Sequence, residues 1–141
     1  KLLYEEYKKK LLELKKVKKE QDAVGQVFTK GLLPIYVLYI LNSNSTNGND
    51  ISHKIGERTG DKWIPSTGGI YPLLKKMEKD KLIEGKWENS KNKMQKIYKI
   101  TDLGICEFKK RKNLLKNKIE ESLEVFKIVY NDLYNEGAEI L

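Results

Sequence analysis

The stretch that decides the fold is Pro65-Ser-Thr-Gly-Gly-Ile-Tyr-Pro-Leu-Leu74, followed by Lys-Lys-Met-Glu-Lys79. Ser66 or Thr67 is expected to cap a helix, because a hydroxyl at that position accepts a hydrogen bond from a free N–H group of the first turn. Apolar residues then recur at the three- and four-residue steps that place them on one face of a helix; they are Ile70, Leu73, Leu74 and Met77. The stretch therefore predicts an amphipathic helix with one buried face.

The opposite face of this helix has a composition suited to an anionic partner. At about 100° per residue, its centre has cations and small residues and no carboxylate, namely Gly68, Pro72, Lys75 and Lys79. Tyr71 lies on one flank and Lys76 on the other. Small residues at a helix start let its free N–H groups approach a phosphate.

Three helices are expected upstream, over residues 1–24, from Thr29 to about Leu41, and from Asn49 or Asp50 to Thr59. The second is apolar nearly all round, which predicts that it is central and buried. Pro34 is acceptable there, because we expect it within about the first turn. In the third helix, Ile51 and Ile55 are expected to point inward.

Two strands are expected downstream, because β-branched and aromatic residues replace the helical spacing. They are predicted over Leu82–Glu88 and Met94–Thr101, joined by the polar, turn-rich stretch of residues 89–93. Lys91 and Lys93 lie in this stretch.

A long last helix is expected from Thr101 or Asp102 to about Asn135, before Gly137. Its roughly 35 residues would span about 50 Å, and a 141-residue monomer has no core of that length. We therefore expect a helix of a second copy to cover its apolar stripe. The predicted dimer interface consists of Leu115, Ile119, Leu123, Phe126, Tyr130 and Leu133.

The order of these elements predicts a mainly α fold with a small two-stranded β wing: a winged helix-turn-helix domain with long N- and C-terminal dimerisation helices. A DNA major groove about 12 Å wide admits one helix, and lysines on the wing can reach neighbouring phosphates. We expect an N-terminal helix over residues 1–28, the DNA-binding domain over 29–101 and the C-terminal dimerisation helix over 102–141.

The charge distribution favours the same partner. The net charge is +8, and residues 66–99 alone contain nine lysines and four carboxylates. A basic patch of this kind favours nucleic acid. The alternative is a lysine-rich surface that serves solubility alone.

The sequence indicates binding rather than catalysis. Cys106 and His53 are the only cysteine and histidine, so a zinc site with about four such ligands cannot form. No glycine-rich nucleotide motif occurs, and we expect no enzyme activity, catalytic residue, metal or cofactor. The longest apolar run, Leu32–Leu41, is too short for a membrane span of about 20 residues. No secretion signal is recognisable, and the single cysteine favours a reducing, cytoplasmic location.

The same residues resemble a known family. Residues 65–74 are similar to its Ser-Pro-Gly-x-x-Tyr-Pro-x-Leu signature, and Ile97-Tyr-Lys-Ile-Thr-Asp-Leu-Gly104 is similar to its strand exit. With Gly31-Leu-Leu and Leu82-Ile83, the chain resembles PadR-type transcriptional regulators over about residues 30–105. The resemblance implies a homodimeric bacterial repressor. Some members respond to phenolic acids or flat hydrophobic drugs, which implies a small hydrophobic or aromatic effector as a further partner.

The chain departs from the family pattern at two positions that bear on the site. Asn49 replaces an aromatic residue, so the packing or phosphate contact that such an aromatic could make is missing. Lys81 stands where the family usually has glycine, so a left-handed turn there would carry a modest strain. The N-terminal helix is also longer than in many members.

We therefore predict a sequence-specific regulator of double-stranded DNA, acting as a homodimeric repressor on a near-palindromic operator. The expected DNA-binding residues are Ser66, Thr67, Gly68, Tyr71, Pro72, Lys75, Lys76, Lys79, Lys91 and Lys93. For Tyr71 the alternative is packing against the wing. For the protein as a whole, the alternatives are a winged-helix protein-interaction or assembly module without specific DNA binding, and an effector sensor whose DNA role is secondary.

Overall fold

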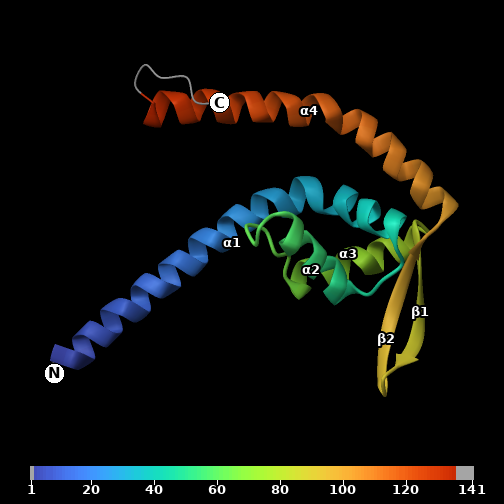
Figure 1. Ribbon diagram of the computed structural model, residues 1–141, viewed down its shortest axis with the longest axis horizontal. Coiled ribbons are helices and arrows are strands. Elements are labelled where there is room, and N and C mark those ends of the chain that lie inside the picture. The colour runs from blue at the N-terminus through green and yellow to red at the C-terminus, as the bar shows by residue number, and fades with distance from the viewer. Residues whose placement is uncertain (1, 136–141) are drawn as a thin grey trace.

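The computed structural model describes residues 2–135, and the side chains of residues 17–29 lie outside the description. Across residues 2–135, four helices and two strands follow one another (Figure 1): α1 (Leu2–Ser43), α2 (Gly48–Arg58), α3 (Thr67–Lys79), β1 (Ile83–Ser90), β2 (Lys93–Ile100) and α4 (Asp102–Tyr134). The two strands form one antiparallel sheet. This architecture confirms the predicted mainly α fold with a two-stranded wing.

The first helix corrects the prediction of two separate helices at the N-terminus. α1 continues through the expected break and through Thr29, whose side chain lies outside the described residues. Pro34 therefore lies inside α1 rather than in a first turn. A proline inside a helix removes one backbone hydrogen bond, and its ring crowds the preceding turn. Such a proline can bend a helix without ending it, and α1 continues beyond Pro34 to Ser43. Figure 1 shows α1 bending where its colour passes from blue to cyan.

Side-chain caps mark the starts of α2 and α4 but not the start of α3. Asn47 caps α2: its Oδ1 accepts from the N–H of Asp50 at 2.7 Å, so α2 begins slightly before the predicted residue 49 or 50. Ser66 occupies the cap position of α3, but its hydroxyl makes no capping hydrogen bond. Thr101 caps α4, with its hydroxyl accepting from the N–H of Gly104 at 3.0 Å.

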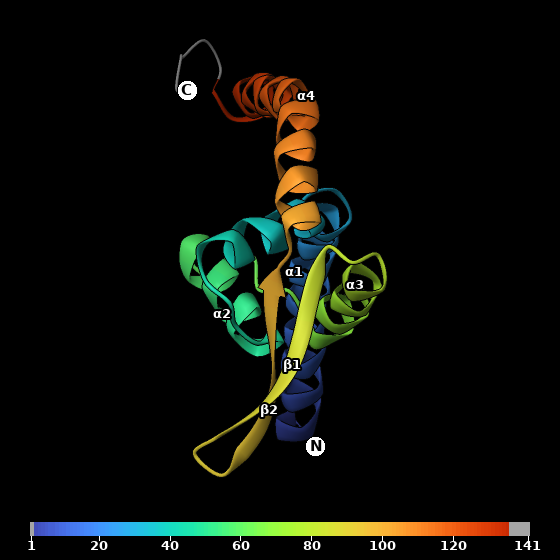
Figure 2. The same ribbon diagram turned by 90° about the vertical axis from the view of Figure 1, so that its right-hand side faces the viewer.

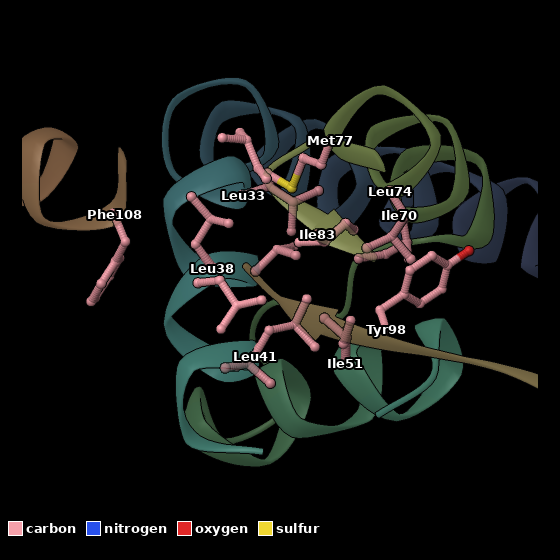
Figure 3. Packing of buried hydrophobic residues seen from close by; sticks show 14 of the residues in the cluster. Leu33, Leu38, Leu41, Ile51, Ile70, Leu74, Met77, Ile83, Tyr98 and Phe108 are labelled. Atoms are coloured by element: carbon pink, nitrogen blue, oxygen red, sulfur yellow. The ribbon is translucent and has the colours of Figure 1, made fainter. Parts of the chain in front are cut away.

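The core lies between the second half of α1, α2, α3 and the base of the hairpin (Figure 3). The predicted inward residues of α2 and α3 are buried, except that Leu73 is half-buried; the buried ones are Ile51, Ile55, Ile70, Leu74 and Met77. From α1 the core takes Leu33, Val37, Leu38, Ile40 and Leu41. The expectation that this segment is central is confirmed.

The hairpin is anchored at one end and free at the other. Tyr98 is buried and pairs through its backbone with Thr46, ahead of α2. At the far end, Lys91 and Asn92 form a two-residue turn in which both have positive φ, at 52° and 63°. That geometry matches the right-handed twist of two paired strands. Figure 2 shows the hairpin extending beyond the body of the molecule.

The turn between α3 and β1 has the predicted left-handed residue. Lys81 has a φ of 62°, its N–H donates to the carbonyl of Glu78 at 3.1 Å, and the N–H of Leu82 donates to the carbonyl of Met77 at 2.9 Å. This hydrogen-bond pair is the Schellman helix ending, which normally uses glycine. The strain expected from the sequence is therefore present.

The two long helices leave the core and extend into solvent. The first half of α1 projects away from the body, and the distal part of α4 stands clear of α2, α3 and the hairpin (Figures 1 and 2). No helix within residues 2–135 combines the length and the apolar character needed to cross a membrane.

Candidate nucleic-acid interface

The outward face of α3 is open to solvent along its whole length. All eight residues predicted there are exposed: Ser66, Thr67, Gly68, Tyr71, Pro72, Lys75, Lys76 and Lys79. Glu78 is the only carboxylate in residues 66–79, and an ion pair turns it toward Lys96 of the hairpin. The outward face of α3 therefore presents three lysines without a competing negative charge.

Tyr71 is held by contacts with the start of α2. Its hydroxyl donates a hydrogen bond to Oδ1 of Asn49 at 3.0 Å. Its ring lies so close to Gly48 that a Cβ there would be 3.0 Å from Tyr71 Cε1. Tyr71 keeps 43% of its surface exposed. The ring also lies near Tyr98 at the base of the hairpin, on whose pKa it acts, so packing against the wing stays an alternative; the exposed part of the ring is accessible to a ligand.

A second contact fixes the hairpin to α3. Lys96 Nζ lies 2.8 Å from Glu78 Oε1, and both side chains are about one-third exposed or less. The hydrogen bond to Glu78 raises the pKa of Lys96 above its ordinary value. Burial raises the pKa of Tyr98, the next residue on this face of β2. Lys96 therefore stays positively charged and joins the wing to the helix that precedes it.

The hairpin end forms a separate basic patch. Lys91 and Lys93 are exposed at and beside the turn, and Figure 1 places this turn at the far end of the hairpin from the body. The ten predicted residues therefore form two exposed groups, one on α3 and one at the hairpin end.

The predicted dimer stripe is exposed on the distal part of α4. Leu115 is half-buried, and the other five residues are exposed: Ile119, Leu123, Phe126, Tyr130 and Leu133. The first turns of α1 also carry exposed apolar residues, namely Leu3, Tyr4, Tyr7, Leu11 and Leu14. Both surfaces are apolar and uncovered in the described part of a single chain.

Three residues near the predicted groups were not predicted as site residues: Asn49, Trp87 and Lys96. Asn49 was recognised only as a missing aromatic, and its pairing with a residue 22 positions away has no local sequence signal. Lys96 and Trp87 are directly paired across the strands. Their shared face depends on the two-residue turn at Lys91 and Asn92, and the longer turn predicted from the sequence shifts the register by one residue, which puts the two side chains on opposite faces.

Comparison with known proteins identifies the family. Residues 37–110 match the family described as Transcriptional regulator PadR-like family. A PadR-like transcriptional regulator from Bacillus cereus is 34% identical, over 68% of this chain and 95% of that protein, with a TM-score of 0.55. Bacillus subtilis PadR, solved in complex with operator DNA, is 29% identical over 56% of this chain and 46% of its own, with a TM-score of 0.52.

A more distant structure shares the fold alone. The PadR family transcriptional regulator from Eggerthella lenta is 17% identical over 78% of this chain and 95% of its own, with a TM-score of 0.64. The matched residues 37–110 include α2, α3, the hairpin and the start of α4, which are the elements that hold the exposed basic surfaces. The chain belongs to the PadR-like family and is a transcriptional regulator rather than an enzyme.

Proposed function

We propose that this protein is a homodimeric repressor that binds a near-palindromic operator in double-stranded DNA. The α3 helix of each copy enters a major groove, and the hairpin contacts phosphates beside it. The observation that carries this proposal is the exposed face of α3, where Tyr71, Lys75 and Lys79 stand without a free carboxylate among them. Lysines at such positions hold phosphates, while the tyrosine is placed to read the edges of bases.

Membership of the PadR-like family supports DNA as the binding partner. Bacillus subtilis PadR has been solved with operator DNA, and its similarity to this chain supports the same type of partner here. The net charge of +8 supports association with a polyanion.

Fluorescence anisotropy with a labelled duplex tests DNA binding. The probe is the region upstream of the protein's own gene, with a mixed-sequence duplex of equal length as competitor. We expect the upstream duplex to bind more tightly and affinity to fall steeply with salt, since each lysine–phosphate contact adds about 0.9 to the slope of log K against log salt.

The paired variant Tyr71→Ala/Lys75→Ala is expected to lower affinity by about a hundredfold, because each side chain that contacts DNA supplies about 1 to 3 kcal/mol. Its control is Lys109→Ala/Lys112→Ala, which removes two exposed lysines of α4 that precede the dimer stripe and should leave DNA affinity nearly unchanged. Equal, weak binding to all duplexes that is indifferent to Tyr71 and Lys75 would contradict the proposal. It would favour the protein-interaction module instead.

The spacing along α4 supports dimerisation through this helix. From Ile119 to Leu133 the apolar stripe advances by four, three, four and three residues, which is the period of 3.5 that a left-handed coiled coil requires. We propose that α4 of a second copy covers this stripe. The apolar face of residues 2–14 extends the interface by crossing to the partner's α4.

Sedimentation velocity tests the dimer. Phe126→Asp places a charge within the stripe and is expected to yield monomers, since a charge in a desolvated interface has no compensating partner. Leu103→Asp is the control, because Leu103 is also exposed on α4 but precedes the stripe. For the α1 extension, removal of residues 1–24 should weaken dimerisation; an unchanged dimer constant would refute this part.

The proposed effector is a small hydrophobic or aromatic molecule bound between the terminal helices of the dimer. A shallow hollow on α4, lined by Ser122, Val125 and Phe126 among others, supports a place for it once a second copy closes the site. Binding of a hydrophobic dye to the wild-type dimer, absent in Val125→Asp, would support it. Absence of dye binding to the wild type would count against it.

A further inference from the structure

Trp87 and Met94 form an apolar patch on the part of the hairpin that extends away from the hydrophobic core. Trp87 and Met94 are 65% and 60% exposed. Trp87 pairs with Lys96, and Met94 pairs with Asn89. Since side chains alternate along a strand and paired residues share a face, both apolar residues lie on the same face as buried Tyr98. The core face of the hairpin therefore continues into solvent as an apolar surface.

The orientation of this patch is fixed relative to α3. Lys96 Nζ lies 6.0 Å from the centre of the Trp87 ring and 5.5 Å from that of Tyr98. The same ammonium group is bound to Glu78 of α3 at 2.8 Å. A cation above an indole ring within about 6 Å is attracted to it. One charged group therefore links the Trp87 ring to the helix proposed to enter the groove.

The charges around the patch indicate what covers it. Lys96 lies on the face of the patch and Lys91 in the turn, while the other charged side chains of the two strands lie on the opposite face. The hairpin as a whole is basic, with five lysines and two glutamates in residues 83–100, so a second copy of the same hairpin would be repelled. A partner that offers both negative charge and apolar C–H surface fits these residues better. The sugar–phosphate backbone of DNA offers both, because its phosphates suit the lysines and its deoxyribose edges suit the ring and the thioether.

We propose that Trp87 and Met94 are DNA-contacting residues that pack against deoxyribose at the edge of a groove, with lysines of the turn and of the opposite face of the hairpin on the flanking phosphates. This inference rests on the proposed function, because it requires that the protein binds duplex DNA. It adds an apolar contact to a wing whose predicted contacts, Lys91 and Lys93, are ionic.

Tryptophan quenching by acrylamide tests the contact directly. Its two tryptophans, Trp63 and Trp87, are 5% and 65% exposed, so the neutral quencher reports mainly on Trp87. The upstream duplex is added to saturation at low salt, and anisotropy verifies that it is bound. The acrylamide quenching constant of Trp87 is then expected to fall several-fold. Trp87→Phe should lose the quenchable signal while keeping that of Trp63.

The salt dependence of variants separates an apolar contact from an ionic one. Trp87→Ala and Met94→Ala are each expected to weaken binding by about fivefold to tenfold, in line with the removal of a partly buried apolar side chain. Their slopes of log K against log salt should be unchanged. Lys93→Ala, the matched control on the same strand, should reduce the slope by about 1, because one phosphate is no longer neutralised.

The outcomes distinguish this inference from the proposed function. Duplex binding with Trp87 still fully quenchable would overturn the inference and leave the repressor proposal intact. Shielding of Trp87 that rises with protein concentration without DNA would assign the patch to self-association and overturn it as well. Failure of every duplex to bind would contradict both.

Discussion

The hydroxyl of Tyr71 in α3 donates a hydrogen bond to Oδ1 of Asn49 in α2, across 3.0 Å. The family resemblance implies an aromatic residue at position 49, and in this chain Asn49 instead accepts the hydrogen bond from Tyr71. The bond holds the Tyr71 ring in a fixed orientation against the start of α2. The two residues therefore form one unit at the start of both helices of the helix-turn-helix.

Variants of this pair should act together on DNA affinity. Tyr71→Phe removes the hydrogen bond but keeps the ring, and we expect it to lower affinity by several-fold with a stability change of at most about 0.5 kcal/mol, as for an exposed hydrogen bond. Asn49→Ala should give a similar reduction. The double variant should be no weaker than the weaker single variant, measured by anisotropy. Fully additive reductions would show that the two residues act separately.

Gly104 is expected to tolerate no side chain. A Cβ there would overlap the carbonyl oxygen of Leu82 and lie 2.7 Å from Ile100 Cγ1. Gly104→Ala should therefore force α4 away from the base of the hairpin and cost about 2 to 3 kcal/mol of unfolding free energy. Urea denaturation measures this cost.

Gly31→Ala is the control for that substitution. A Cβ at Gly31 meets nothing within 4 Å, and alanine is a better helix former by about 0.5 to 1 kcal/mol. The control should therefore be stabilised. Equal effects at the two glycines would refute the close approach of α4 to Leu82.

Lys81→Gly should stabilise the protein. Lys81 adopts a φ of 62°, where a side chain is strained, and glycine relieves that strain at some cost in unfolded-chain entropy. The expected net gain is up to about 1 kcal/mol in the free energy of unfolding. Lys112→Gly, in the exposed interior of α4, should instead destabilise the protein by about 1 kcal/mol. Destabilisation at both positions would contradict the strained turn.

The Glu78–Lys96 pair should show a measurable coupling that disappears in alkali. A double-mutant cycle with Glu78→Gln and Lys96→Met is expected to give about 0.5 to 1 kcal/mol near neutral pH. Glu78 raises the pKa of Lys96 in the folded protein. The stability that the ion pair contributes is therefore fully present below the ordinary lysine pKa of 10.5, and it is lost as the pH rises through the raised pKa of Lys96. A coupling that persists in strong alkali would show that the contact is not ionic.

Much of the fold could be predicted from local sequence signals. Thr101 indicated the start of α4, the helical spacing of residues 70–77 defined α3, and the shift to β-favouring residues after residue 82 defined the hairpin. The left-handed Lys81 could also be anticipated from where glycine is usual. Each of these features depends on residues close together in the chain.

The errors and omissions have a different origin. The break expected between residues 24 and 29 did not occur, because one residue suited to a cap does not end a helix whose turns on both sides are helical. Pro34 likewise bends α1 rather than ending it. The Tyr71–Asn49 and Lys96–Glu78 contacts join residues 22 and 18 positions apart. They arise only after α2, α3 and the hairpin have packed, so no local pattern encodes them. That the exposed lysines and Tyr71 contact DNA stays a prediction.

Hydroxyl-radical footprinting of the upstream duplex tests the central claim most directly. Two copies that place α3 in successive major grooves should protect two tracts centred about 10 base pairs apart, on a near-palindromic sequence. Phe126→Asp, which is expected to break the proposed dimer, should abolish the paired pattern, while Leu103→Asp should preserve it. A single protected tract, or uniform weak protection along the duplex, would contradict a homodimeric repressor that reads DNA through α3.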